Sequence, residues 1–332
     1  MTTTTRREFA NGMALTAASA ILGLSAKPAD AEPPPETTSL RLERLPFDHA
    51  CLAPQWVAEE LLRAEGFTDI TFTTTPDGIG ALAAGKVDFA GADIMSLLLA
   101  LDTGLPLAVI GGIHAGCFEL FGTSRVRSLR DLKNSTVAVG WAGGQALVTA
   151  MAAYVGLDPL RDAKLIQPPS KEAIELLAQE KIDALLGFPP EPQELRKRSI
   201  GHVVVSTSED RPWSQYFCCM AAVNAQFLKK NPTATKRMLR AFLKATNMCA
   251  LEPERVGRFL VDRGFVKNQD YAVQAIKEIP YTRWREYDPA DTMRFYALRL
   301  HETGMIKTSP LKIIARSTEW RFFNELRKEL KA

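Results

Sequence analysis

Residues 40–75 read LRLERLPFDHACLAPQWVAEELLRAEGFTDITFTTT, and this stretch decides the fold class. Its two ends, residues 40–45 and 70–75, are short segments with the apolar pattern of strands. Residues 54–65 between them place apolar side chains such as Trp56 on one stripe, so they predict an amphipathic helix. A strand, a helix and a second strand in this order indicate a parallel sheet and an α/β protein.

Downstream, strand and helix patterns continue to alternate in two blocks. The first block continues with a buried strand over residues 85–90, a helix over 94–103 and consecutive strand segments over 107–121. The second block has strands near 136–140, 163–166, 182–186 and 203–205, with helices near 145–155 and 171–179. An apolar strand over 216–223 follows, and amphipathic helices at 234–250, 253–262, 291–303 and 318–330 complete the chain. We therefore expect two α/β units and a helical C-terminal region.

Length and composition agree with two globular units. The chain has 332 residues, of which 46% are hydrophobic and 24% are charged. A single core rarely grows beyond about 250 residues, so two domains are expected. The formal net charge is only +3, and the lysines and arginines are scattered along the chain. This distribution argues against binding to nucleic acid or to anionic lipid.

The N-terminus has the three parts of an export signal. Arg6 and Arg7 precede Phe9 in a twin-arginine-like motif, residues 13–24 form a short apolar run, and residues 29–31 offer a small-residue cleavage site. We expect a signal peptide that is removed on export.

Residues 1–31 are thus predicted to be a twin-arginine-type signal peptide, followed by an extended, mobile, proline-rich leader over residues 32–38. Cys51 is too far from the cleavage site to carry a lipid anchor. No apolar run reaches the roughly 20 residues of a membrane span. The mature protein is expected to be periplasmic, soluble and not a lipoprotein.

Several motifs occur in a characteristic order. They are GKVDFA at 85–90, SLRDLK at 128–133 followed by the strand at 136–140, VGLDP at 155–159 and QEKIDA at 179–184. In this order they resemble the solute-binding proteins of ABC importers for nitrate, sulfonate, taurine and thiamine precursors, a family similar in fold to the thiamine-pyrimidine synthases. The resemblance covers nearly the whole mature chain.

The resemblance implies a two-lobed periplasmic binding protein type II fold, in which two strands cross between the lobes and a solute binds in the cleft. It places residues 39–120 and 221–332 in lobe one and residues 121–220 in lobe two. The crossings are then expected near residues 116–121 and 216–220.

The five cysteines, at positions 51, 117, 218, 219 and 249, are odd in number and irregularly spaced. No pattern of cysteine and histidine has the local spacing of a zinc site, so we expect neither a metal nor a cofactor. By the resemblance, Cys117 lies on one crossing and Cys218 and Cys219 on the other. Two alternatives are therefore open for these cysteines: a disulfide from Cys117 to Cys218 or Cys219, or free thiols.

The expected solute site consists of loops that follow strands, because ligands of open α/β sheets lie beyond the carboxyl ends of the strands. The candidate ligand-binding residues are Phe47, Asp48, His49, Asp93, His114, Trp141, Gly143, Gly144, Gln145, Phe188, Glu191 and Trp213. The glycines at a helix start favour an anionic group, whereas the acidic side chains favour an amine. A zwitterion or a heteroaromatic solute would use both.

A plainer structural role is open for these candidates. The plainer roles are helix capping for Asp48, an empty turn for Gly143 and Gly144, a hinge hydrogen bond for His114 and the neighbouring Glu119, a rigid proline-rich loop for Phe188 and Glu191, and interdomain packing for Trp213.

The predicted function is that of a solute-binding component of an ABC importer, which captures a small organic solute by hinge closure. Its expected partners are the solute and a membrane permease, with no nucleic acid, and we expect a monomer. A ligand-presenting sensor has the same fold and remains an alternative. An enzyme like the thiamine-pyrimidine synthases is less favoured, because no lysine lies between Lys27 and Lys86 to hold pyridoxal phosphate and no G-x-S-x-G elbow occurs.

Overall fold

The structure is a computed structural model that describes residues 32–46, 48–159 and 161–330. The chain divides into two units, Met1–Pro34 and Pro35–Ala332, and every element below belongs to the second unit. The predicted signal peptide, residues 1–31, lies outside the described residues, as does Phe47. Within the described ranges, no helix combines the length and the apolar character needed to cross a membrane.

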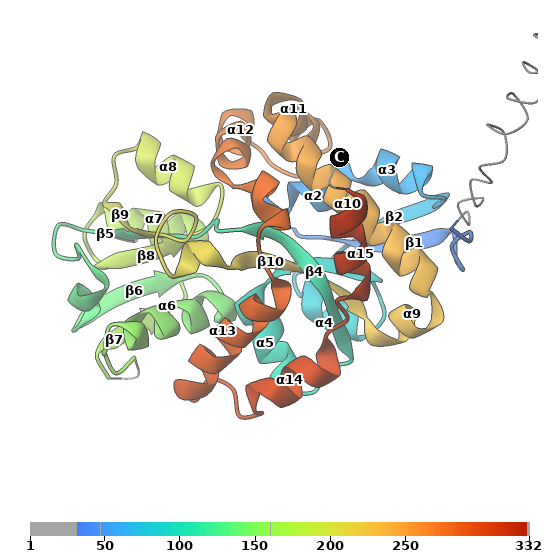
Figure 1. Cartoon of the computed structure of the whole chain (residues 1–332). Helices are drawn as coiled ribbons and strands as arrows, with labels where there is room; N and C mark the ends of the chain where they lie inside the picture. Colours follow the sequence, from blue (N-terminus) through green and yellow to red (C-terminus); the bar gives the residue numbers. More distant parts are fainter. Residues whose placement is uncertain (1–31, 47, 160, 331–332) are drawn as a thin grey trace, which may run out of the picture. The chain divides into compact units, whose positions relative to one another are not determined.

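The first sheet has five strands in the order β2-β1-β3-β10-β4 (Figure 1). Their bounds are β1 Ser39–Arg44, β2 Asp69–Thr74, β3 Phe89–Asp93, β4 Leu107–Ala115 and β10 Phe217–Asn224. Strand β1 runs parallel to β2 and β3, whereas β10 is antiparallel to both β3 and β4. All residues of β4 and β10 are buried, which explains why both sequences are apolar apart from His114 and Asn224.

The second sheet repeats this topology in the order β7-β6-β8-β5-β9. Its strands are β5 Glu119–Gly122, β6 Ser135–Val139, β7 Ala163–Ile166, β8 Ala184–Gly187 and β9 His202–Ser206. Strand β6 is parallel to β7 and β8, and β5 is antiparallel to β8 and β9. We call each sheet with the helices that pack on it a lobe. The predicted α/β fold with two repeated units is confirmed.

Helices cover both sheets and form the C-terminal region. Those of the sheet-forming part are η1 Ala50–Leu52, α2 Ala53–Val57, α3 Glu59–Ala64, α4 Gly78–Ala83, α5 Ile94–Asp102, η2 Leu129–Leu132, α6 Ala142–Tyr154, α7 Ser170–Ala178, α8 Glu191–Lys197 and η3 Trp213–Gln215. The C-terminal ones are α9 Ala225–Lys230, α10 Pro232–Leu251, α11 Pro253–Asp262, α12 Gln269–Glu278, η4 Tyr281–Arg285, α13 Pro289–Glu302, α14 Pro310–Ser317 and α15 Arg321–Glu329.

Two helix predictions differ from the structure. The helix expected over residues 54–65 is split at Ala58 into α2 and α3. The last helix begins at Arg321 instead of residue 318, because Thr318 forms a β-bridge with Val109 and the next amide donates a hydrogen bond to the Val109 carbonyl at 2.9 Å. Pairing with β4 therefore extends the chain where periodicity alone predicted a helix.

The chain passes between the sheets twice, through residues 116–118 and through residues 207–216. Thr207 ties these crossings together: its Oγ1 accepts hydrogen bonds from the amides of Cys117 at 3.2 Å and Phe118 at 2.9 Å. Strands β5 and β10 begin at Glu119 and Phe217, so each starts before the lobe boundary expected at 121 or 221.

Gly116 allows the two crossings to approach each other. Its φ is +38°, a backbone conformation that side-chain-bearing residues rarely adopt. A Cβ atom there would lie 2.3 Å from the backbone of Ser208 on the second crossing. Both the conformation and the close contact require glycine.

The end of the predicted leader is fixed to the fold. The Glu36 carboxylate accepts hydrogen bonds from the amides of Thr233 at 2.9 Å and Ala234 at 2.8 Å, at the start of α10. A carboxylate at a helix N-terminus satisfies otherwise free amides and interacts favourably with the helix dipole. The expectation of a mobile leader therefore does not extend to Glu36.

Candidate functional site

A cavity of about 550 Å³ lies between the carboxyl-end loops of the two sheets. Lobe one contributes the ends of β1 and β3 and the starts of α4 and α5, and lobe two contributes the loops that follow β6 and β8. Its wall includes Glu43, His49, Asp77, Asp93, Ser96, Phe118, Trp141, Phe188 and Cys219. A cavity of this size suits one small organic molecule.

One part of the wall is aromatic. The rings of His49 and Phe188 stack with centroids 4.7 Å apart, although they come from different lobes. Trp141 meets Phe188 edge to face at 5.2 Å and lies tilted against Phe118 at the same distance. These rings offer both flat faces and edges to a planar solute.

Asp93 connects the two lobes beside this aromatic wall. As the N-cap of α5, its carboxylate accepts hydrogen bonds from the Ser96 amide at 2.9 Å and from the Ser96 hydroxyl at 2.6 Å. The indole Nε1–H of Trp141 in lobe two donates to the same carboxylate at 3.2 Å. Burial raises the pKa of Asp93 to about 6, against which these hydrogen bonds act. The group is therefore mostly ionised at neutral pH.

Gly143 permits this contact between the lobes. A Cβ atom at this position would lie 2.2 Å from the Ser96 hydroxyl and 2.5 Å from the Asp93 carboxylate. The first turn of α6 can therefore approach the first turn of α5 only because residue 143 has no side chain. In this arrangement the glycine serves packing between lobes, while the neighbouring Trp141 faces the cavity.

Glu43 is a cavity residue that sequence reasoning missed. It lies in β1 and is only 3% exposed. Its carboxyl group packs against Gly78, where an added Cβ atom would lie 1.4 Å from the Oε1 atom of Glu43. Burial raises the pKa of Glu43 to about 8, and the negative charge of Asp77 adds to this shift. The sequence does carry a signal that could have identified Glu43: it is an acidic residue near the carboxyl end of the first strand, which is where the solute site is expected.

The titratable groups of the wall make the cavity acidic. Besides Glu43 and Asp93, Asp77 caps α4 by accepting a hydrogen bond from the Gly80 amide at 2.8 Å. Burial lowers the pKa of His49 to about 4, so its imidazole is neutral at physiological pH. Among the described residues that line the cavity, none is lysine or arginine.

The structure therefore brings four predicted site residues to the cavity wall, namely His49, Asp93, Trp141 and Phe188. The others have different surroundings. Asp48 accepts a hydrogen bond from the Lys267 amide at 3.0 Å and does not cap the helix that follows, because the N-cap of η1 is His49. Gly144 and Gln145 lie in the first turn of α6 beyond the cavity lining.

Trp213 and Glu191 are buried away from the lining. Trp213 is 2% exposed and packs edge to face against Tyr154 and Phe295, so the interdomain packing role fits its position. The Glu191 carboxylate accepts a hydrogen bond from the Phe188 amide at 3.1 Å and so holds the turn that presents Phe188. Burial raises the pKa of Glu191 to about 7.

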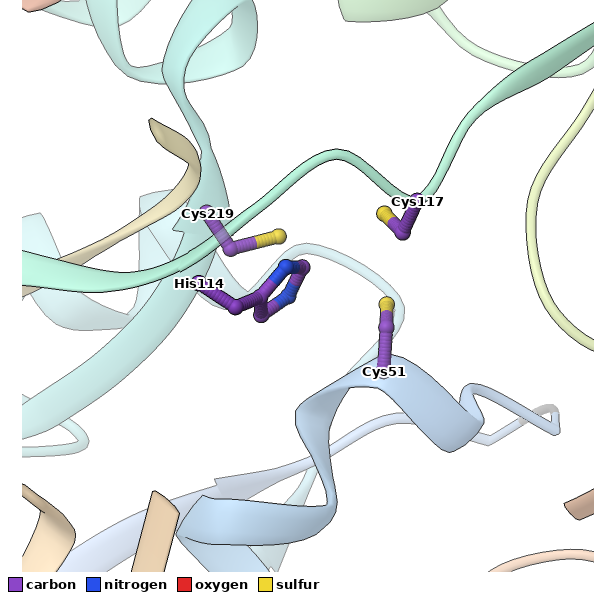
Figure 2. Close-up of side chains that lie close together, drawn as sticks. All are labelled: Cys51, His114, Cys117 and Cys219. Atoms are coloured by element: carbon purple, nitrogen blue, oxygen red, sulfur yellow. The ribbon is translucent and has the colours of Figure 1, made fainter. Parts of the chain in front are cut away.

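His114 and Glu119, which flank the first crossing, also make contacts outside the cavity. The Glu119 carboxylate pairs with Arg196 of α8, and the same guanidinium pairs with Glu278 of α12. His114 is completely buried and lies beside Cys51, Cys117 and Cys219 (Figure 2). Only Cys219 of this group also lines the cavity.

Comparison with known proteins identifies relatives over part of the chain. A family model described as "NMT1/THI5 like" matches residues 69–256. The chain is 22% identical over 204 residues to 4-amino-5-hydroxymethyl-2-methylpyrimidine phosphate synthase THI11 of Saccharomyces cerevisiae, which covers 57% of this chain and 59% of that protein. It is 26% identical over 125 residues to bicarbonate-binding protein CmpA of Synechococcus elongatus, covering 37% of this chain and 27% of that protein. The chain thus matches less than two thirds of the length of either relative.

A solved structure with the same fold is the periplasmic nitrate-binding protein NrtA from Synechocystis PCC 6803. It superposes with a TM-score of 0.75 at 16% sequence identity, and the match covers 90% of each chain. The likeness establishes a shared fold: two sheets linked by two crossings.

Proposed function

The chain belongs to the NMT1/THI5-like family, and from this membership and its interlobe cavity we propose that it is the extracytoplasmic solute-binding component of an ABC importer. The family resemblance predicted from the sequence is thereby confirmed. The observation that carries the proposal is a cavity whose wall comes from both lobes. A solute held there contacts both lobes only when they are together, so it stabilises the closed state relative to an open one.

The cavity chemistry favours a particular solute class. Nitrate and bicarbonate, named for the relatives above, are anions, but the described lining carries the carboxyl groups of Glu43, Asp77 and Asp93 and no basic side chain. A buried anion beside these groups would lack a compensating charge. We infer that this protein takes an aromatic or heteroaromatic amine, whose ring packs on Trp141 and Phe188 and whose nitrogen meets a carboxylate.

The test is thermal unfolding of the purified protein with a panel of solutes. The panel contains aminopyrimidines, thiamine and aromatic amines, with nitrate, bicarbonate and alkanesulfonates for comparison. A bound solute at 100 times its dissociation constant adds about 2.7 kcal/mol to the free energy of unfolding, which raises the midpoint temperature. Stabilisation by amines alone supports the inferred class. Stabilisation by the anions alone refutes the amine while retaining the binding role.

The enzyme alternative has a specific basis, because the yeast relative is named as a synthase. Mass spectrometry of the solute before and after incubation separates the two functions. An importer component returns the solute unchanged, whereas turnover would identify an enzyme.

The proposed export is tested by cell fractionation of the full chain and of the double variant Arg6→Lys, Arg7→Lys. The parent protein should reach the periplasm and the variant should not.

A further inference from the structure

Four side chains that are far apart in the sequence converge beside the cavity (Figure 2). They are Cys51 of η1, His114 of β4, Cys117 of the first crossing and Cys219 of β10. One ligating atom from each lies within 4.8 Å of all the others, and all four residues are buried. Figure 2 shows the imidazole ring among the three thiols.

His114 is oriented as a ligand. Its Nδ1 lies 3.2 Å from the Ala115 carbonyl oxygen, which can only accept a hydrogen bond, so Nδ1 carries the proton. Nε2 then has a free lone pair, and among the described residues this buried atom has no hydrogen-bond partner. A buried acceptor left unsatisfied is unfavourable, because its lost hydration is not replaced. A backbone carbonyl that fixes the tautomer in this way is the usual support of a metal-binding histidine.

We propose that Cys51, His114, Cys117 and Cys219 bind one thiophilic metal ion, with Zn²⁺ the best match. Three thiolates and an imidazole are a soft donor set that suits zinc and disfavours magnesium or calcium. In tetrahedral zinc sites, metal–sulfur distances of about 2.3 Å place neighbouring sulfurs about 3.8 Å apart. The observed upper limit of 4.8 Å between donor atoms exceeds that separation by about 1 Å. Each coordinating thiol releases its proton to solvent, and no oxidation state changes.

The position of the site links it to the lobes. Cys117 lies on the first crossing, and Cys219 lies on the strand that completes the second. A bound ion would therefore join both connections to the first loop of lobe one. Because Cys219 also lines the cavity, the ion would lie directly beside the proposed solute.

A disulfide is the chemical competitor of this site. The Sγ atoms of Cys117 and Cys218 are 3.1 Å apart, yet all five cysteines are free thiols in the structure. Oxidation of this pair would consume one of the four ligands. The redox state of the isolated protein is therefore part of the test.

The first experiment titrates Co²⁺ and then Zn²⁺ into the reduced, chelator-treated full chain. We expect one Co²⁺ per chain, with a sulfur-to-metal charge-transfer band, intense tetrahedral d–d bands and displacement by Zn²⁺. Zinc X-ray absorption should show three sulfur ligands and one nitrogen ligand. This measurement needs no variant and no solute, so it succeeds or fails independently of the proposed transport role. Absence of the tetrahedral spectrum overturns the site.

Variants then assign the ligands. Cys51→Ser, Cys117→Ser and His114→Asn should each weaken Zn²⁺ binding by more than about 100-fold, the upper end of the loss expected for an outer-shell partner. Cys249→Ser is the matched control, because Cys249 is equally buried but lies outside the cluster. Equal affinity in the ligand variants and the control refutes the assignment. Recovery of a Cys117–Cys218 disulfide from periplasm-derived protein, found by peptide mapping, also overturns it.

Discussion

At the scale of single residues, Glu43 and Asp93 differ in the surroundings that the fold gives their carboxyl groups. Burial raises the pKa of both Glu43 and Asp93, but only Asp93 has hydrogen bonds that stabilise its ionised form. Glu43 is therefore mostly protonated at neutral pH and can donate a hydrogen bond, whereas Asp93 mostly carries a charge. Two carboxyl groups in one cavity can thus recognise different parts of a solute.

Glu43 gives the protein a distinct pH dependence. Its pKa rises from about 4.5 to about 8 on folding, so between these values the folded state binds more protons than the unfolded state. The free energy of unfolding then falls as pH rises, by about 1.4 kcal/mol per pH unit from this group. The variant Glu43→Gln keeps the size of the side chain but cannot ionise. It should therefore abolish the part of the pH dependence of unfolding free energy that comes from Glu43.

Urea unfolding at several pH values between about 5 and about 8 measures the effect. Glu60→Gln, at an exposed position on α3, is the control and should retain the parent slope. Parallel stability curves for the parent and Glu43→Gln would show that Glu43 is ionised in the folded protein.

Trp141 supplies the hydrogen bond that joins the lobes at Asp93. Trp141→Phe keeps an aromatic ring but removes the donor. The pKa of Asp93 should then rise above about 6, because the hydrogen bond that is removed stabilised the ionised carboxylate. Solute affinity should fall by about 10- to 150-fold, since a hydrogen bond to a charged group contributes about 1.5–3 kcal/mol.

Carbon NMR titration of the Asp93 carboxyl and calorimetry with the solute found by screening measure these two effects. Trp320→Phe, at a half-buried position next to α15, is the matched control. An unchanged Asp93 pKa in Trp141→Phe would show that the bond is absent in solution.

At the scale of elements, the two crossings form one connected hinge. Thr207 of the second crossing accepts hydrogen bonds from the amides of Cys117 and Phe118 in the first crossing. Gly116 allows the two backbones to come into contact. Because the lobes are joined through these short segments, motion of one lobe against the other requires changes in their backbone torsions.

Gly116→Ala should destabilise the fold by about 1–3 kcal/mol or more, because it adds backbone strain to a clash with Ser208. Gly104→Ala is an informative control, since Gly104 has φ of +87° but no atom of the residues that the structure describes lies within 4 Å of the position that a Cβ atom would take there. The control should therefore show the strain alone. Chemical denaturation measures both variants, and equal losses would show that the crossings separate easily at Gly116.

At the scale of the whole molecule, contacts away from the cavity also hold the lobes together. Arg196 of α8 in lobe two pairs with Glu278 of the C-terminal helix α12, and Gln193 donates a hydrogen bond to the same carboxylate at 2.8 Å. These groups are partly exposed, so their contribution to stability is expected to be below about 1 kcal/mol. Their effect on the balance between open and closed states is more easily detected.

Arg196→Gln should therefore shift the solute-free protein toward an open arrangement while changing the unfolding midpoint little. Small-angle scattering should show a larger radius of gyration than in the parent. Arg198→Gln is the matched control, because Arg198 pairs only with lobe-two residues Glu175 and Glu194 among its described ion pairs. If both variants scatter like the parent, Arg196 does not restrain the lobes.

The sequence by itself determined the alternation of strands and helices and the family. These features depend on local periodicity and on motifs such as residues 85–90, which persist in a single chain segment. It also pointed to His49, Asp93, Trp141 and Phe188, because these residues lie at or just after the carboxyl ends of strands that face the cavity.

Only the tertiary structure decided which candidates reach the cavity and which groups meet across it. The inward position of Glu43, the packing role of Gly143 and the burial of Trp213 depend on neighbours from distant segments. The proposed metal ligands span residues 51–219, with only His114 and Cys117 close in sequence, so no spacing motif could reveal them. Local patterns record the conformation of a segment, whereas a site between lobes is created by contacts that the folded chain alone brings together.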